Sequence, residues 1–316
     1  MPIPGYLLAN NLAVLALSVF LLGIALIIGL SNKRRPSIHV ELFIVVLVGA
    51  HILQILIATH SLDTYLYLVS MFAFSPARCA PDYGLLVAPG GPAVCLWTPF
   101  SHAFLHWDSL HLFGNGVALF IFGRTVAWRL GGQAFFLFFI LGCAAGAVAH
   151  MAFYWGSIEP LAGASAGVLG IMGASFRFVP RAEDRLKALF WPSEELRQLP
   201  LTGILEVITE RRSLVYVLYC FIIFPLGLTA LVAGTSGNVA VIAHVGGFAF
   251  GILGIGYFDR RRAIPQPEHL DQTETNTIPE PRGLWLLRVL AFAMMVVGIV
   301  TGIAGYYLPN LLGWQF

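Results

Sequence analysis

Charged residues are scarce in this chain of 316 residues, in which Asp, Glu, Lys and Arg make up 11% and hydrophobic residues 58%. Soluble domains carry about 25% charged residues. The chain has too few to cover a soluble surface, so the bilayer must be part of its solvent. Residues 1–32 contain no charged side chain, and neither do residues 213–258. A basic patch with interleaved aromatic residues is also missing, which argues against nucleic-acid binding.

Eight apolar stretches are suited to crossing a membrane, for which a helix needs about 20 apolar residues. They cover residues 6–30, 40–60, 108–127, 133–155, 162–178, 214–232, 241–257 and 286–308. The first is not expected to be a cleaved signal peptide, because it lacks a basic n-region and its apolar run is too long. The predicted fold is therefore an all-α polytopic membrane protein with eight spans.

Lys and Arg residues divide unevenly between the two sides of such a topology. With alternating spans, 17 of the 18 basic residues fall on one side, and only Arg78 falls on the other. The positive-inside rule makes the crowded side cytoplasmic and places both termini outside. Residues 179–212 then form a charged cytoplasmic loop, and residues 263–283, rich in Pro and polar residues, form a flexible linker.

The chain has only four cysteines. Cys143 and Cys220 lie in predicted spans, where cysteine is expected to be a small packing residue. Cys79 and Cys95 share the long outer loop, residues 61–105, where the compartment can be oxidising. Whether these two form a disulfide stays open, because the sequence does not fix their geometry.

A serine stands in the apolar segment "EPLAGASAGVLGIMG", residues 159–173. Gly163-Ala-Ser165-Ala-Gly167 is the G-x-S-x-G pattern of a hydrolase nucleophile elbow. The soluble form of that elbow needs a strand before the serine and a sheet beneath it, and the sequence predicts neither. Gly163 and Gly167 also form G-x-x-x-G, which lets membrane helices pack closely. Taken alone, the segment favours helix packing over catalysis.

A histidine lies inside a second apolar segment, "VIAHVGGFAFGILG". Ionisable groups at membrane depth usually face the interior of a bundle or a water-filled cavity. Gly247 and Gly251 share the helix face of His244. Two glycine-lined helices can approach until Ser165 Oγ meets a ring nitrogen of His244, at about 2.6–3.2 Å, as nucleophilic catalysis requires. The alternative is a core histidine bonded to a carbonyl. No carboxylate lies near His244, so a dyad is favoured over a triad.

Further polar side chains occur in "FSHAFLHWDSLHLFGNGVALFIFG". His111 and Asn115 are four residues apart and so share a helix face, and both can donate hydrogen bonds to an oxyanion. His106 precedes that helix. The alternative is a zinc site made of His102, His106, His111 and Asp108. This spacing is not a common zinc pattern and H-E-x-x-H is absent, so no metal or other cofactor is expected.

Together the three segments resemble the rhomboid family of intramembrane serine proteases. Its hallmarks are H-x₄-H-x₃-N, G-x-S-x and A-H-x₂-G-x₃-G on the second, fourth and sixth core helices. The matching residues here, in the same order, are His106-x₄-His111-x₃-Asn115, Gly163-Ala-Ser165-Ala and Ala243-His244-x₂-Gly247-x₃-Gly251. The long outer loop and its "FAFSPAR" segment also fit, and the resemblance covers residues 38–260.

The resemblance implies six core helices around a water-filled cavity that opens to the outside, with one extra helix at each end of the chain. The domains expected on this basis are an extra N-terminal helix in 1–37, the protease core in 38–260, a linker in 261–284 and an extra C-terminal helix in 285–316.

The resemblance also implies roles for individual residues. Ser165 is similar to the nucleophile and His244 to the general base. His111 and Asn115, with the Ser165 backbone N–H, resemble the oxyanion hole. The supporting positions are His106, Gly163, Gly247 and Gly251. Three positions depart from the family pattern: Leu169 replaces a frequent aromatic residue, Ala127 replaces a frequent glutamate, and Ala166 replaces the usual second glycine.

The expected function is therefore cleavage of single-span or other transmembrane proteins within the lipid bilayer, in the plasma membrane of a bacterium. Ser165 and His244 are both expected within about 5–6 Å of the outer loops, at 1.5 Å rise per residue. One alternative is a transporter, which should show repeated halves with broken helices, and no repeat is visible. Another is a non-proteolytic binding protein or chaperone of the same fold, which would be expected to lose Ser165 or His244.

Overall fold

The computed structural model describes residues 38–80, 89–182, 185–190, 192–209, 211, 216 and 237–259. In this part of the chain all regular secondary structure is helical, which confirms the predicted all-α class there. Four of its helices are long and apolar enough to cross a membrane. They are α2 (Ile38–His60), α5 (Ser109–Leu130), α6 (Gly132–Phe153) and, through Val241–Phe258, α13 (Gly237–Phe258).

These four helices correspond to the predicted spans 40–60, 108–127, 133–155 and 241–257. Three other predicted spans lie outside the described residues: 6–30, 214–232 and 286–308. Cys220, the predicted linker 263–283, and the terminal domains 1–37 and 285–316 lie outside them as well. The eight-span count and the domain boundaries therefore stay predictions.

The span predicted at 162–178 is much shorter than expected. Its helix, α7 (Ser165–Ser175), has 11 residues, which is about 16 Å at 1.5 Å per residue. The helix begins late because Gly163 has φ +123°, outside the helical region. It ends before Phe176, where the backbone tightens and the cap amide bonds Met172 and Ala174. The reading of Gly163 and Gly167 as one helical packing motif is therefore wrong.

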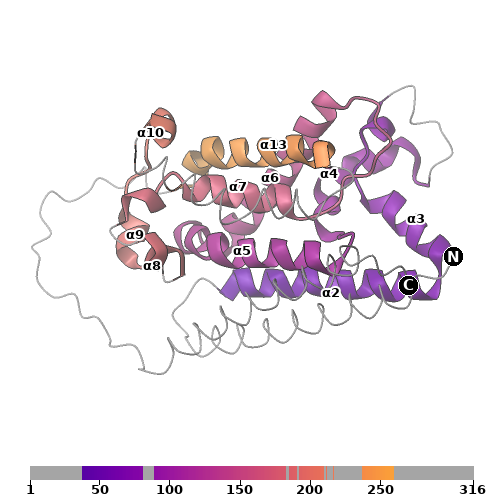
Figure 1. Ribbon diagram of the computed structural model, residues 1–316, viewed down its shortest axis with the longest axis horizontal. Helices are drawn as coiled ribbons and strands as arrows, with labels where there is room; N and C mark the ends of the chain where they lie inside the picture. Colours follow the sequence, from indigo (N-terminus) through magenta and orange to yellow (C-terminus); the bar gives the residue numbers. More distant parts are fainter. Residues whose placement is uncertain are drawn as a thin grey trace, which may run out of the picture.

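Short helices occupy the two ends of the bundle (Figure 1). One end holds α3 (Leu62–Phe72), η1 (Pro76–Cys79), η2 (Gly91–Leu96), α4 (Thr98–Ser101) and η3 (His102–Phe104). The opposite end holds η4 (Val179–Arg181), α8 (Arg185–Phe190), α9 (Glu194–Gln198) and α10 (Ile204–Thr209). The long helices run between these two groups, so the two ends of the bundle have different connecting segments.

The helix α7 is held between α5, α6 and α13. At two glycines of α13 its contact with this helix is a close approach of the two backbones. A β-carbon added at Gly247 would collide with the carbonyl oxygen of Ala166, and one added at Gly251 would collide with that of Gly170. Only glycine fits at these two positions, so the predicted smooth face of the His244 helix does bring α13 directly against α7.

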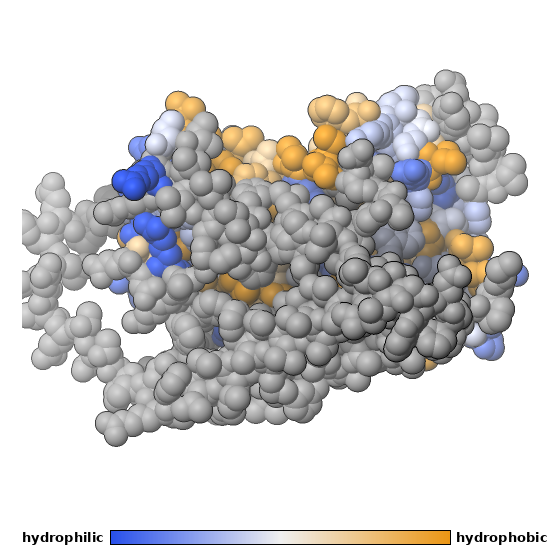
Figure 2. Space-filling view, in the orientation of Figure 1, coloured by the Kyte–Doolittle hydropathy of each residue, from blue (hydrophilic) through white to orange (hydrophobic). Residues whose placement is uncertain are grey.

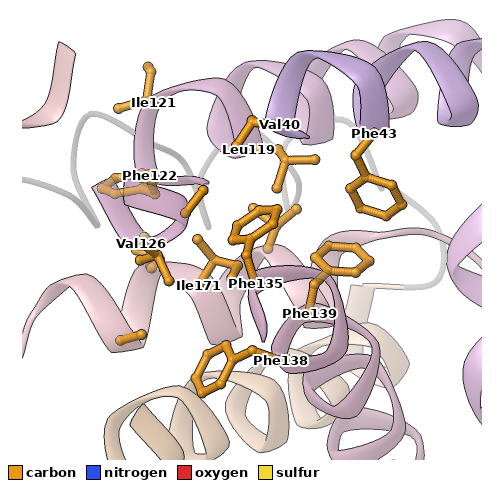
Figure 3. Close-up of a cluster of buried hydrophobic side chains, with 14 of the residues drawn as sticks. Val40, Phe43, Leu119, Ile121, Phe122, Val126, Phe135, Phe138, Phe139 and Ile171 are labelled. Carbon is orange, nitrogen blue, oxygen red and sulfur yellow. The ribbon is translucent and has the colours of Figure 1, made fainter. Parts of the chain in front are cut away.

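Aromatic side chains of α6 fill the space between this helix and α2, α5 and α13. Figure 3 shows Phe135, Phe138 and Phe139 of α6 among apolar side chains from the neighbouring helices. All three are at most 1% exposed. The ring of Phe139 meets that of Phe43 on α2 edge to face, with centroids 4.6 Å apart. This cluster fixes the distance between α2 and α6, and α5 packs beside it.

The outward faces of the bundle are apolar. Val245, Leu253 and Tyr257 on α13 and Leu137 on α6 are all more than half exposed. In Figure 2 hydrophobic residues lie along the upper side of the view, and hydrophilic residues gather toward its two ends. Exposed apolar side chains between two polar ends are what a bilayer requires of a protein that crosses it.

One covalent link and several polar links tie together the described residues between α3 and α5. Cys79 and Cys95 form a disulfide, with Cα atoms 5.5 Å apart, which settles the question that the sequence left open. The Arg78 guanidinium donates to the carbonyl oxygens of Ser70, Pro89 and Gly91. These links join α3, η1 and η2 to one another at that end of the bundle.

Candidate active site

Ser165 and His244 meet inside the bundle. Ser165 Oγ lies 2.6 Å from His244 Nε2, so the predicted contact between these side chains is present. Ser165 is the first residue of α7, and His244 lies on α13 and is 7% exposed. His244 lies farther along its helix than the about 5–6 Å expected from the sequence. Because α13 already begins at Gly237, His244 lies seven residues, or about 10 Å, along it.

The turn before Ser165 is built by contacts with the residues between α3 and α5. Leu161 pairs with Phe74 in an antiparallel bridge, through N–H to oxygen distances of 2.6 and 3.0 Å. The Gly163 amide then donates to the His102 carbonyl at 2.9 Å. Ala164 takes a helical conformation, and α7 starts at Ser165. An extended residue, a turn with positive φ and a helix thus follow one another, and the serine stands at the helix start.

The backbone at this helix start is a source of hydrogen-bond donors. The first amides of a helix have no acceptor within the helix, and the helix dipole makes this end electropositive. The Val168 amide is the first to bond back within the turn, to Ala164. The amides from Ser165 to Gly167 precede it, so they lie where negative charge on a reacting group would be stabilised.

His111 and Asn115 lie against the same turn. A β-carbon added at Gly163 would be 2.6 Å from His111 Cε1 and 3.8 Å from Asn115 Nδ2. Glycine is thus required at position 163 for two reasons: its φ is positive, and the His111 ring leaves no room for a β-carbon. Both side chains come from the first two turns of α5, which Asp108 caps by accepting from the His111 amide at 2.8 Å. The structure therefore brings both predicted oxyanion donors to the serine turn.

His106 lies behind Asn115 and is fully buried. Asn115 Nδ2 is 3.1 Å from His106 Nε2. An amide nitrogen only donates, so His106 accepts through Nε2 and carries its proton on Nδ1. Burial lowers the pKa of His106 well below its ordinary value, and neighbouring His111, His51 and His102 lower it further. The ring is consequently neutral, as this hydrogen bond requires.

Two polar residues of α2 that lie beside His106 were not predicted from the sequence. Gln54 Nε2 donates to the His106 carbonyl at 2.9 Å, and Gln54 Oε1 accepts from the His106 amide at 3.1 Å. His51 Nε2 lies 3.1 Å from Ser109 Oγ, at the start of α5. The spacing of these two residues could have indicated that they face the bundle interior. His51 and Gln54 stand three apart in an apolar span, where polar side chains usually face the bundle interior.

The remaining sequence hypotheses for this region concern Leu169 and a metal. Leu169 is partly buried and packs against the hydrophobic core. As for the zinc alternative, the described residues include no group of three or more His, Cys, Asp or Glu side chains that could hold a metal ion.

An all-helical membrane protein with a hydrogen-bonded Ser–His pair inside its bundle is the class that the fold and site define. The sequence model of the rhomboid domain matches residues 94–261, more than half of the chain, and the chain therefore belongs to the rhomboid family. It is an integral membrane protein of a family that acts on membrane-protein substrates within the bilayer. No curated protein and no solved structure matched the chain. Ser165, His244, His111 and Asn115 all lie within the matched residues, whereas His51 and Gln54 lie before them.

Proposed function

We propose that this protein is an intramembrane serine endopeptidase that cleaves transmembrane segments of membrane proteins, with Ser165 as nucleophile and His244 as general base. The observation that carries the proposal is the 2.6 Å contact between Ser165 Oγ and His244 Nε2. Nucleophile and base within hydrogen-bond reach are the geometric signature of covalent catalysis. Family membership supports the reaction class, but inactive members exist, so this pair of residues is what favours activity.

The proposed reaction begins with proton transfer from Ser165 Oγ to His244 Nε2 as the oxygen attacks the scissile carbonyl carbon. The carbonyl oxygen becomes an oxyanion. His111, Asn115 and the Ser165 backbone N–H would donate hydrogen bonds to it. His244 then gives its proton to the leaving amine, which breaks the peptide bond and leaves an acyl-enzyme. Water attacks this ester with His244 again as base, and the second product leaves as a carboxylic acid.

A substrate helix must unwind before it can react, because its carbonyls are bonded within the helix. The late start of α7 supports a site suited to this. Ser165 begins the helix rather than lying in its middle, so its hydroxyl group and the first-turn amides lie at the same end of α7. A locally extended substrate segment would present one carbonyl to both.

The finer topology is part of the same proposal. We place residues 38–260 as a six-helix core in a bacterial plasma membrane, with both chain termini outside the cytoplasm. The basic residues support this orientation, because Arg181 and Arg197 lie in the segments after α7, at the end opposite α3 and α4. Ser165 begins α7 at the α3 and α4 end. Substrates would accordingly be cut toward their outer ends.

A fluorophosphonate probe that reacts with activated serines tests the proposal. The full-length protein in detergent micelles should be labelled, and Ser165→Ala should abolish labelling. Ser175→Ala is the matched control, because Ser175 lies at the far end of the same helix, is buried, donates to the Met172 carbonyl and lies 3.5 Å from Tyr216 Oη. It should label like the wild type. Equal labelling of wild type and Ser165→Ala would refute the assignment and favour a non-proteolytic binding protein or a transporter.

A further inference from the structure

Gln54 makes an unusual pair of hydrogen bonds for a residue inside an apolar helix. It is 4% exposed, and both ends of its amide are used by one residue, the main chain of His106. His106 lies in the irregular segment between η3 and α5, where its amide and carbonyl have no helical partners. Buried main-chain groups must find partners. The Gln54 side chain supplies both, in the way that a neighbouring strand would.

The consequence reaches Asn115 through the His106 ring. Fixing the main chain of His106 fixes where its Nε2 lies, and Nε2 accepts one of the two N–H groups of the Asn115 amide. The amide is planar, so the direction of its second N–H is then set as well. Asn115 Nδ2 also lies beside Gly163, two residues before Ser165. The orientation of this donor toward the serine turn thus depends on where α2 holds His106.

A second contact makes the attachment to α2 rigid. His51, one turn before Gln54, bonds Ser109 at the start of α5, and its ring meets that of His106 edge to face, with centroids 6.2 Å apart. α2 therefore holds both the segment before α5 and the first turn of α5. With two points of attachment, this segment cannot rotate about either one.

We propose that Gln54 is a positioning residue of the oxyanion hole: by binding the main chain of His106 it orients the Asn115 amide toward the oxyanion. The role rests on the proposed protease function. An oxyanion donor acts in the transition state and not in substrate binding, so misorienting it lowers kcat and leaves KM unchanged. A purely structural role of Gln54 predicts a loss of folded protein with an unchanged kcat per folded molecule.

The first test replaces Gln54 with methionine, which has similar size and no hydrogen-bonding amide. In proteoliposomes with a single-span model substrate, Gln54→Met should lower kcat by about 10- to 100-fold with KM unchanged. Leu47→Ala is the matched control, because Leu47 is fully buried on the same helix and lies two turns before Gln54. It should lower thermal stability and keep kcat. The effects of Gln54→Met and Asn115→Ala should not add in the double variant, because both disable one donor.

The second test is rescue by Gln54→Glu. A protonated carboxyl group is isosteric with the amide and can still accept from the His106 N–H and donate to its carbonyl. An ionised one cannot donate. The ratio of kcat for Gln54→Glu to kcat for the wild type should therefore be near one at low pH and fall as pH rises. The nearby titrating groups, His51, His106, His111 and Asp108, are present in both proteins, so the ratio removes their contribution.

The outcomes separate the two proposals. Unchanged kcat in Gln54→Met, additive effects with Asn115→Ala, or a flat kcat ratio for Gln54→Glu would overturn the positioning role while leaving the protease function intact. A wild type that neither cleaves the substrate nor reacts with the fluorophosphonate probe would overturn both. If Gln54→Met does not fold, the pH dependence of Gln54→Glu decides alone, because its protonated form keeps both hydrogen bonds.

Discussion

The two ends of the helix bundle are both held by buried polar groups, but by groups of different kinds. At the α3 and α4 end the contacts join neutral partners: Gln54 with His106, His106 with Asn115, and Ser165 with His244. At the opposite end they include two pairs of opposite charge. Arg129 lies 2.7 Å from Asp259, and Arg124 lies 3.3 Å from Glu41, all of them buried.

This difference matches what each end has to do. A buried ion pair is strongly held once formed, and removing one partner is costly, which suits a permanent joint between α5 and α13 or between α2 and α5. Neutral histidines and amides can accept and release protons or donate to a transient charge, which a catalytic site needs. Variants at the charged end are therefore expected mainly to alter stability, and variants at the neutral end mainly to alter kcat.

The largest effect on stability is expected at the charged end. Asp259→Asn leaves the Arg129 guanidinium buried without its counter-charge and should lower the free energy of unfolding by about 3–5 kcal/mol. Thermal or denaturant unfolding in micelles measures this. Because the pair is far from Ser165, kcat per folded molecule should stay near the wild-type value.

The control for that variant is Glu206→Gln. It breaks the pair between Glu206 and Arg181, whose side chains are 56% and 35% exposed. Exposed pairs contribute little, so stability should barely change. Equal losses in Asp259→Asn and Glu206→Gln would show that burial of the Arg129 pair is not what matters.

At the neutral end the expected loss is kinetic. Asn115→Ala and His111→Ala should each lower kcat by ~10²-fold, or about 2.7 kcal/mol, the usual effect of removing one oxyanion donor. Both side chains face the serine turn rather than the aromatic core, so unfolding temperatures should change little. Full activity in both variants would remove them from the proposed mechanism, and a loss of folding without a change in kcat would make them structural.

A smaller effect, a dependence of stability on pH, is expected from His102 at the neutral end. Burial lowers the pKa of His102 to about 4, from an ordinary value of 6.5. Below pH 6.5 the unfolded chain binds a proton that the folded chain does not, so stability should fall as pH drops from 6.5 toward 4. At pH 5 the contribution of His102 is about 2 kcal/mol. Unfolding of wild type and His102→Gln between pH 7.5 and 5 measures it, and identical slopes would contradict it.

Much of the candidate site could be predicted from the sequence because few residue types suit it. A histidine followed by Gly247 and Gly251 in an apolar helix predicts a close helix contact, and the structure shows that contact against Ala166 and Gly170. His111 and Asn115 were predicted to share a helix face from their spacing alone, and they do. In each case a local period fixes which side chains lie together.

Other features could not be predicted because they depend on contacts between distant segments. The late start of α7 follows from the positive φ of Gly163, whose amide bonds the His102 carbonyl and which lies against the His111 ring. Gln54 is 52 residues from His106, and no period connects them. The disulfide was undecided for the same reason, since a separation of 16 residues does not fix the 5.5 Å between the Cα atoms.

The most direct measurement is proteolysis by the purified protein in proteoliposomes, with a single-span model substrate and mass spectrometry of the products. We expect the wild type and Ser175→Ala to make one or a few cuts in the outer half of the substrate's transmembrane segment. We expect none by Ser165→Ala or His244→Ala, whose rates should fall by about 10⁴-fold or more. Cleavage that persists in Ser165→Ala, or an inactive wild type that is folded, would contradict the central claim.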